Sequence, residues 1–68
     1  MLVRFKNNRN LPISEIGRIF LSNGKPVGEI VDIINGDVIC ELEIHSIQFI
    51  SNIMRDASFE LINNYKGR

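Results

Sequence analysis

Two Asn-Gly pairs, Asn23-Gly24 and Asn35-Gly36, constrain this 68-residue chain more than any other feature. Asn-Gly tolerates the two successive positive φ angles of a type I′ turn, and a two-residue turn of this kind joins adjacent antiparallel strands. Both pairs are flanked by residues rich in Ile and Val, which favour strands. The sequence therefore predicts a three-stranded antiparallel meander over residues 13–44.

The second pair predicts the register of the hairpin that it closes. With Asn35-Gly36 as the loop, Ile34 faces Asp37, and the pairing runs back until Glu29 faces Leu42. Successive side chains alternate between the two faces of a sheet. The predicted core face carries Val27, Val31, Ile33, Val38, Cys40, Leu42 and Ile44, with Glu29 as its single charge. The opposite face carries Ile30, Asp32, Ile34, Asp37, Ile39, Glu41 and Glu43.

The first pair predicts a second register that agrees with this one. With Asn23-Gly24 as the loop, Arg18 faces Glu29, so that the lone acid of the predicted core face meets a base. Residues 13–22 also fit a helix. We prefer the strand because Gly17 disfavours a helix interior by ~1 kcal/mol, and because only the strand accounts for the match between Arg18 and Glu29.

The sequence before the meander predicts one further strand. Residues 2–6 alternate apolar Val3 and Phe5 with basic Arg4 and Lys6, which is typical of a short strand, and we expect it at an edge of the sheet.

After the meander the apolar period changes from two to 3.6. A stripe formed by Ile47, Ile50, Ile53, Met54 and Ala57 predicts a helix from about Ser46 to Asp56 that covers the core face. This helix either continues to Tyr65 or ends near Asp56, leaving Phe59 and Leu61 to alternate in a last short strand. We favour the strand, because a continued helix would turn Phe59 away from the stripe into solvent.

Together these elements predict an α+β fold. It consists of a small, mainly antiparallel sheet, built from the meander, the N-terminal strand and a C-terminal strand, with one helix packed on one face. Residues 1–68 are expected to form a single small domain, with residues 64–68 as a polar tail. A single core of this size supplies about 3–5 kcal/mol, so that a second copy or a partner would add to its stability.

The residue types exclude several kinds of chemistry. One Cys and one His cannot form an intramolecular disulfide or supply the four ligands of a structural zinc site. We therefore expect neither metal nor cofactor. Cys40 and His45 are the conventional nucleophile and base, but Cys40 falls on the predicted core face, where burial lowers thiol reactivity. The sequence indicates a protein without catalytic activity.

Composition also predicts where the protein works. The chain contains no apolar run approaching the ~18 residues of a membrane span and no signal-peptide pattern. We expect a cytoplasmic protein without a membrane partner. Frequent Ile and Asn would follow from AT-rich codons, which suggests a low-GC bacterium, a phage or another mobile element.

Charge is segregated along the chain although the net charge is zero. Residues 1–25 sum to +4 and residues 26–54 to −5. On one interpretation, adjacent strands neutralise each other, each exposed pair contributing ~0.5 kcal/mol. On the other, the acidic face is a contact surface, because three isoleucines among its acids would form an apolar patch. These residues are Ile30, Asp32, Ile34, Asp37, Ile39, Glu41 and Glu43.

The second interpretation predicts a small regulator or inhibitor that acts stoichiometrically on a protein partner. We also expect a homodimer that buries the three isoleucines. The alternative function is nucleic-acid binding through the basic residues Arg4, Lys6 and Arg9. A sequence pI near 6.5 and the absence of a stripe of aromatic and basic residues make it the second choice.

Overall fold

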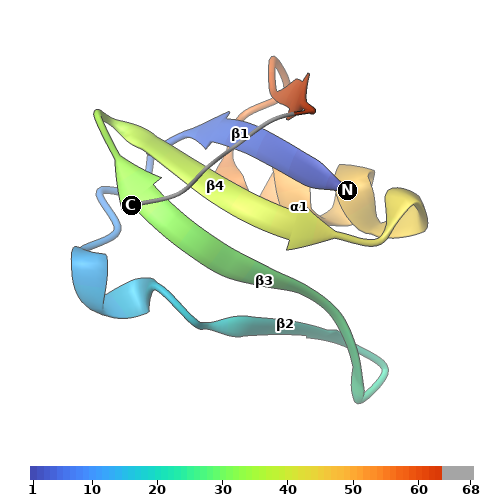
Figure 1. Cartoon of the computed structure of the whole chain (residues 1–68). Helices are drawn as coiled ribbons and strands as arrows, with labels where there is room; N and C mark the ends of the chain where they lie inside the picture. The colour runs from blue at the N-terminus through green and yellow to red at the C-terminus, as the bar shows by residue number, and fades with distance from the viewer. Residues whose placement is uncertain (64–68) are drawn as a thin grey trace.

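The computed structural model describes residues 1–63, which form an antiparallel sheet with one α-helix against it (Figure 1). The strands are β1 (Leu2–Lys6), β2 (Ile19–Ser22), β3 (Lys25–Ile34), β4 (Asp37–Leu42) and β5 (Glu60–Ile62). The helix is α1 (Ile47–Met54), and two short 3₁₀ helices are η1 (Ile13–Glu15) and η2 (Ile44–Ser46). The five strands lie in the order β2-β3-β4-β1-β5. Residues 64–68, the predicted tail, lie outside the described residues.

The predicted α+β fold is confirmed, including the meander, the N-terminal strand, the C-terminal strand and the helix on one face. Both Asn-Gly pairs form the predicted turns. Their φ angles are all positive, at 53° for Asn23 and Asn35, 79° for Gly24 and 80° for Gly36. Two predictions about the flanks are wrong. β1 lies between β4 and β5 rather than at an edge, and residues 13–22 begin with η1 and become a strand only at Ile19.

A bulge in β3 changes the predicted faces of the second hairpin. Ile34, Ile33 and Asp32 face Asp37, Val38 and Ile39 as predicted, but the register then shifts and Ile30, not Val31, faces Cys40. Val31 is thus the extra residue of the bulge, and Ile30 and Glu29 just before it point to the opposite faces from those predicted. The bulge turns Ile30 into the core and Glu29 out of it, which avoids burying a carboxylate.

A second irregularity shifts the first hairpin. Phe20 faces Gly28 and Ile19 faces Glu29, so that the predicted pairing of Arg18 with Glu29 is wrong. Arg18 instead binds Glu15, with Nη1 2.9 Å from Oε1. Gly28 packs so closely against β4 that an added Cβ would lie 2.3 Å from Leu42 Cδ2.

The hydrophobic core lies between one face of the sheet and α1. It contains Val3, Phe5, Ile30, Ile33, Val38, Cys40, Leu42, Ile50 and Met54. Phe59 packs against Phe5, with ring centroids 5.7 Å apart. The prediction that Ile44 belongs to this face is wrong, because the chain leaves the sheet at η2 and Ile44 is 60% exposed.

The helix lies within its predicted limits. α1 turns Ile50, Ser51 and Met54 inward and ends at Arg55, whose φ of 58° is left-handed. Ser46 occupies the N-cap position, although its side chain makes no capping hydrogen bond. Among residues 1–63, no helix is long and apolar enough to cross a membrane.

Candidate functional site

A shallow groove lies on the sheet near β2. Residues of β2, β3 and the end of β4 line it. It has a volume of about 280 Å³ and opens broadly to solvent. We call it the acidic groove, and it is lined by Ile19, Pro26, Val27, Gly28, Glu29, Glu41, Leu42 and Glu43. Its walls combine apolar side chains with three glutamates, which is a surface suited to a ligand that is both apolar and basic.

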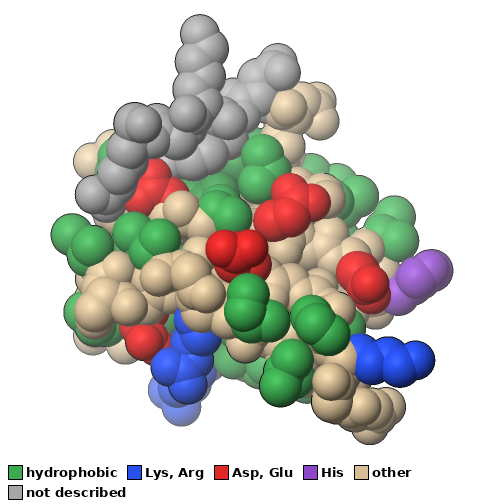
Figure 2. Space-filling model, turned by 60° about the horizontal axis from the view of Figure 1, so that its bottom comes forward, with side chains coloured by type: hydrophobic (Ala, Val, Ile, Leu, Met, Phe, Trp, Pro, Cys, Tyr) green, Lys and Arg blue, Asp and Glu red, His purple; other side chains and the backbone are tan. Residues whose placement is uncertain are grey.

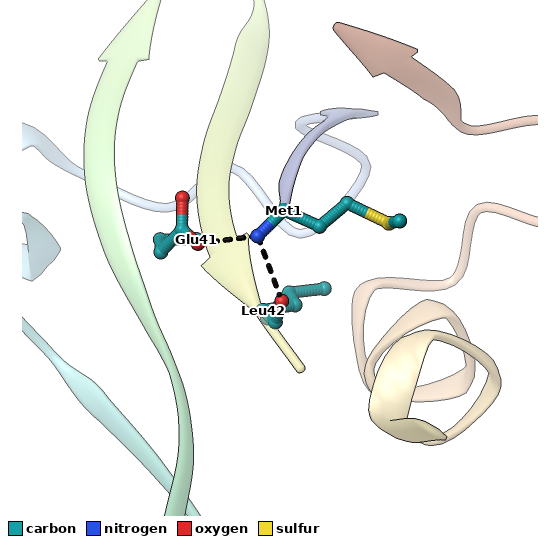
Figure 3. Close-up of polar contacts among 3 residues, drawn as sticks. All are labelled: Met1, Glu41 and Leu42. Atoms are coloured by element: carbon teal, nitrogen blue, oxygen red, sulfur yellow. Dashed lines mark hydrogen bonds and ion pairs between the residues drawn. The ribbon is translucent and has the colours of Figure 1, made fainter. Parts of the chain in front are cut away.

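Two of the glutamates face each other across the sheet. Glu29 of β3 and Glu41 of β4 are direct partners in the register, and like charges in this position destabilise a sheet. The N-terminal ammonium group compensates Glu41: it forms an ion pair with Oε1 and donates to the Leu42 carbonyl at 3.1 Å (Figure 3). Within residues 1–63, neither Glu29 nor Glu43 has an ion-pair partner.

The strand beside the groove presents apolar side chains to solvent. Ile19 is 48% exposed and Leu21 is 56% exposed, while Phe20 between them packs against the core. In the sheet, Ile19 lies opposite Glu29. In Figure 2, which brings the side of the molecule near β2 toward the viewer, acidic side chains lie beside a group of hydrophobic ones. The exposed apolar strand and the acidic groove therefore form one continuous surface.

The acidic face predicted from the sequence is only partly assembled. Ile30 lies in the core and is 1% exposed, and Ile39 is 2% exposed. Ile34 remains 37% exposed beside its turn. The prediction of an exposed patch of three isoleucines is therefore wrong, for Ile30 because of the bulge in β3. Asp32 is also buried, and its Oδ1 accepts a hydrogen bond from the Ile33 N–H at 2.8 Å.

The remaining acids of the predicted set are divided between two places. Glu41 and Glu43 line the acidic groove, whereas Asp37 lines a separate charged pocket at the opposite end of β4. Sequence reasoning missed Ile19, Leu21 and Glu29 as surface residues. The sequence did contain a signal for Glu29. A lone glutamate on a predicted core face would be costly to bury, which indicates that it lies at the surface instead.

The basic residues of the N-terminal region do not form an open cationic surface. Arg4 Nη2 lies 2.5 Å from Glu60 Oε2, and Lys6 faces Asp37 across the sheet. Arg9 Nη1 donates to the Ile53 carbonyl at 3.4 Å. The pocket that contains Arg4 and Lys6 is also lined by Asp37, Asp56, Ser58 and Glu60. This arrangement agrees with neutralisation between adjacent strands.

Cys40 and His45 occupy different environments. Cys40 is fully buried in the core, where desolvation raises the pKa of its thiol to about 12, whereas His45 is exposed in η2. A thiol with so high a pKa is a poor nucleophile near neutral pH. No group of His, Cys, Asp and Glu residues in the described part of the chain could hold a metal ion.

Comparison with known proteins places the chain in no family, since no family model, curated protein or solved structure matches it. The features that indicate a function are therefore those of its own surface. The acidic groove and the apolar strand beside it are the features that fit a partner.

Proposed function

We propose that the protein is a non-enzymatic regulator or inhibitor that acts stoichiometrically by binding another protein through the acidic groove. The observation that carries this proposal is the opposition of Glu29 and Glu41 next to exposed Ile19. Facing carboxylates destabilise a sheet, and the N-terminal ammonium group compensates only Glu41, so that a cation supplied by a partner would compensate Glu29. Glu29, which has no ion-pair partner among residues 1–63 and lies beside exposed apolar side chains, is thus better suited to a complex than to the isolated chain.

The proposed partner presents basic and apolar residues together. Its lysines or arginines would meet Glu29, Glu41 and Glu43, and its apolar side chains would cover Ile19 and Pro26. Complementary charges of this kind favour rapid and specific association. A nucleic acid is the weaker alternative, because phosphates would be repelled by the groove and because Arg4 is already paired with Glu60.

A second copy of the chain is a less suitable occupant than a different protein. The expected homodimer depended on Ile30, Ile34 and Ile39, and two of these side chains are buried. A dimer through the acidic groove would bring the glutamates of both copies together. We therefore propose a monomer that pairs with a basic partner in the cytoplasm, where a free cysteine such as Cys40 stays reduced.

Reversing the charge of Glu29 is expected to abolish partner capture. Tagged wild-type protein, incubated with nuclease-treated lysate of the cells that make it, should retain a protein in a stoichiometric amount. Glu29→Lys should reduce that retention at least tenfold, because interfacial charge reversal costs well over the ~1.4 kcal/mol that a tenfold change represents. Gln48→Lys adds a positive charge to the exposed side of α1 and serves as the control.

Equal retention by wild type and Glu29→Lys would refute the acidic groove as the binding site. Material that nuclease treatment removes, and whose binding falls steeply as salt increases, would instead support the nucleic-acid alternative. Circular dichroism of both variants confirms that the fold is unchanged.

A further inference from the structure

We infer that the partner of the acidic groove binds by adding an extended strand to the open edge of β2, with a basic side chain directed over Ile19 toward Glu29. The inference rests on the proposed function above, and it specifies how the partner is held. Three features carry it: the unpaired backbone edge of β2, the absence of protection along that edge, and the charge of the neighbouring row of side chains.

One side of the β2 backbone has no neighbouring strand in the described part of the chain. Within residues 1–63, β2 lies at the end of the sheet and pairs only with β3. The Arg18 carbonyl accepts a hydrogen bond from the Ile30 N–H at 2.9 Å and therefore points toward β3. Successive residues of an antiparallel strand alternate in this direction. Ile19 and Leu21 therefore direct their N–H and C=O groups to the open side.

This edge lacks the usual protection against pairing. Edge strands are commonly blunted by charged residues, proline or a bulge, and β2 has the sequence IFLS, which contains neither charge nor proline. The irregularity of this hairpin leaves β2 itself regular, because the residue without a partner is Val27 of β3. By contrast, β5 at the opposite end of the sheet carries Glu60. The edge of β2 is thus open to strand addition.

The acidic side chains in line with Ile19 indicate what kind of strand would add to β2. Ile19, Glu29 and Glu41 are successive partners across β2, β3 and β4. Strands lie about 4.8 Å apart, so that a residue opposite Ile19 on an added strand would be about 10 Å from Glu29. A lysine or arginine there can pack its apolar stem on Ile19 and extend its charge to the carboxylate. A second copy of the chain would instead bring two acidic grooves close to each other, which favours a basic segment of another protein.

A nine-residue peptide that alternates valine and lysine is a direct probe of this mode. Backbone hydrogen bonds supply much of the affinity when a peptide joins a sheet edge. In the complex, hydrogen exchange of the outward Ile19 and Leu21 amides, measured by NMR, should slow at least tenfold. The same peptide with glutamate in place of lysine should not bind.

Two substitutions of Leu21 separate the backbone contribution from that of the side chain. Leu21→Pro removes an outward N–H but no hydrogen bond to β3. An edge strand tolerates proline at such a position. It should weaken peptide binding at least tenfold, whereas Leu21→Ala, which keeps the N–H, should weaken it less than threefold. Thermal unfolding of both variants checks that they fold. If Leu21→Pro does not fold, the hydrogen-exchange measurement on the wild-type protein decides whether the peptide adds to β2.

Three results would overturn strand addition. They are no peptide binding at millimolar concentration, binding without slower exchange at Ile19 and Leu21, or equal weakening by the two Leu21 variants. Each leaves the proposed function standing if the wild-type protein still captures a protein that Glu29→Lys loses. Failure of that capture refutes the proposed function itself.

Discussion

Replacing Phe5 by alanine is expected to leave most of the protein unfolded at room temperature. Phe5 is fully buried in the centre of the core and contacts Phe59 of the chain that leads into β5. Truncation of a buried phenylalanine to alanine costs about 3–5 kcal/mol, while the single core of so small a domain seldom supplies more than ~3–5 kcal/mol. Far-UV circular dichroism and urea denaturation measure the loss directly.

Leu61→Ala is the matched control for this prediction. Leu61 is an apolar residue of β5, but it is 56% exposed, so its truncation should change the free energy of unfolding by less than ~0.5 kcal/mol. A Phe5→Ala protein that loses less than ~1 kcal/mol would contradict the arrangement of the core described above, because its expected cost is several times larger.

Replacing Asp56 by alanine is expected to destabilise the protein by about 3 kcal/mol, because hydrogen bonds to a buried carboxylate are among the strong ones. Asp56 is 6% exposed and follows α1. Its Oδ2 accepts from the Lys6 N–H at 2.7 Å, and its Oδ1 accepts from the Ser58 N–H at 2.9 Å and the Ser58 hydroxyl at 2.8 Å. The carboxylate thus fastens the turn after α1 to the end of β1. Urea denaturation near pH 7 measures the difference.

The same contacts make stability depend on pH in acid. The Lys6 backbone N–H, followed by the donors of Ser58, lowers the pKa of Asp56 below its usual value. A carboxylate with a lowered pKa in the folded state contributes stability that is complete above its unfolded pKa of ~3.9 and is lost as pH falls through the folded pKa. Asp56→Asn removes this ionisation with little change of shape. Identical loss of stability below about pH 4 in wild type and Asp56→Asn would contradict the role given to the carboxylate.

Local turn chemistry made much of the fold predictable. The two Asn-Gly pairs correctly indicated both hairpins, because positive φ at two successive residues is a local requirement that few pairs meet. The change of apolar period after Ile44 likewise indicated α1, whose buried stripe is a local property of the sequence. Strand order was not predictable in this way, since the pairing of β1 with β4 and β5 joins segments distant along the chain.

The candidate site was harder to predict because it depends on two shifts of register. Val31 and Ile30 are both apolar and β-branched, so local preference does not decide which of them enters the core. Packing against β4 and the rest of the core decides which residue is buried. Ile30 enters the core and is 1% exposed, and Glu29 turns to the surface. One unpaired residue in a strand moves the side chains beyond it, counted from the turn, to the opposite face. The opposition of Glu29 and Glu41 in the acidic groove follows from that change.

Site-specific photocrosslinking in the producing cells tests most directly whether β2 and the acidic groove form the binding surface. Leu21 on β2 is replaced by the photoreactive residue benzoylphenylalanine, and Gln48 on the exposed side of α1 receives the same replacement as the control. We expect a covalent adduct with one protein from position 21 and none from position 48. Adducts from position 48 but not from position 21, or the same adducts from both, would contradict it.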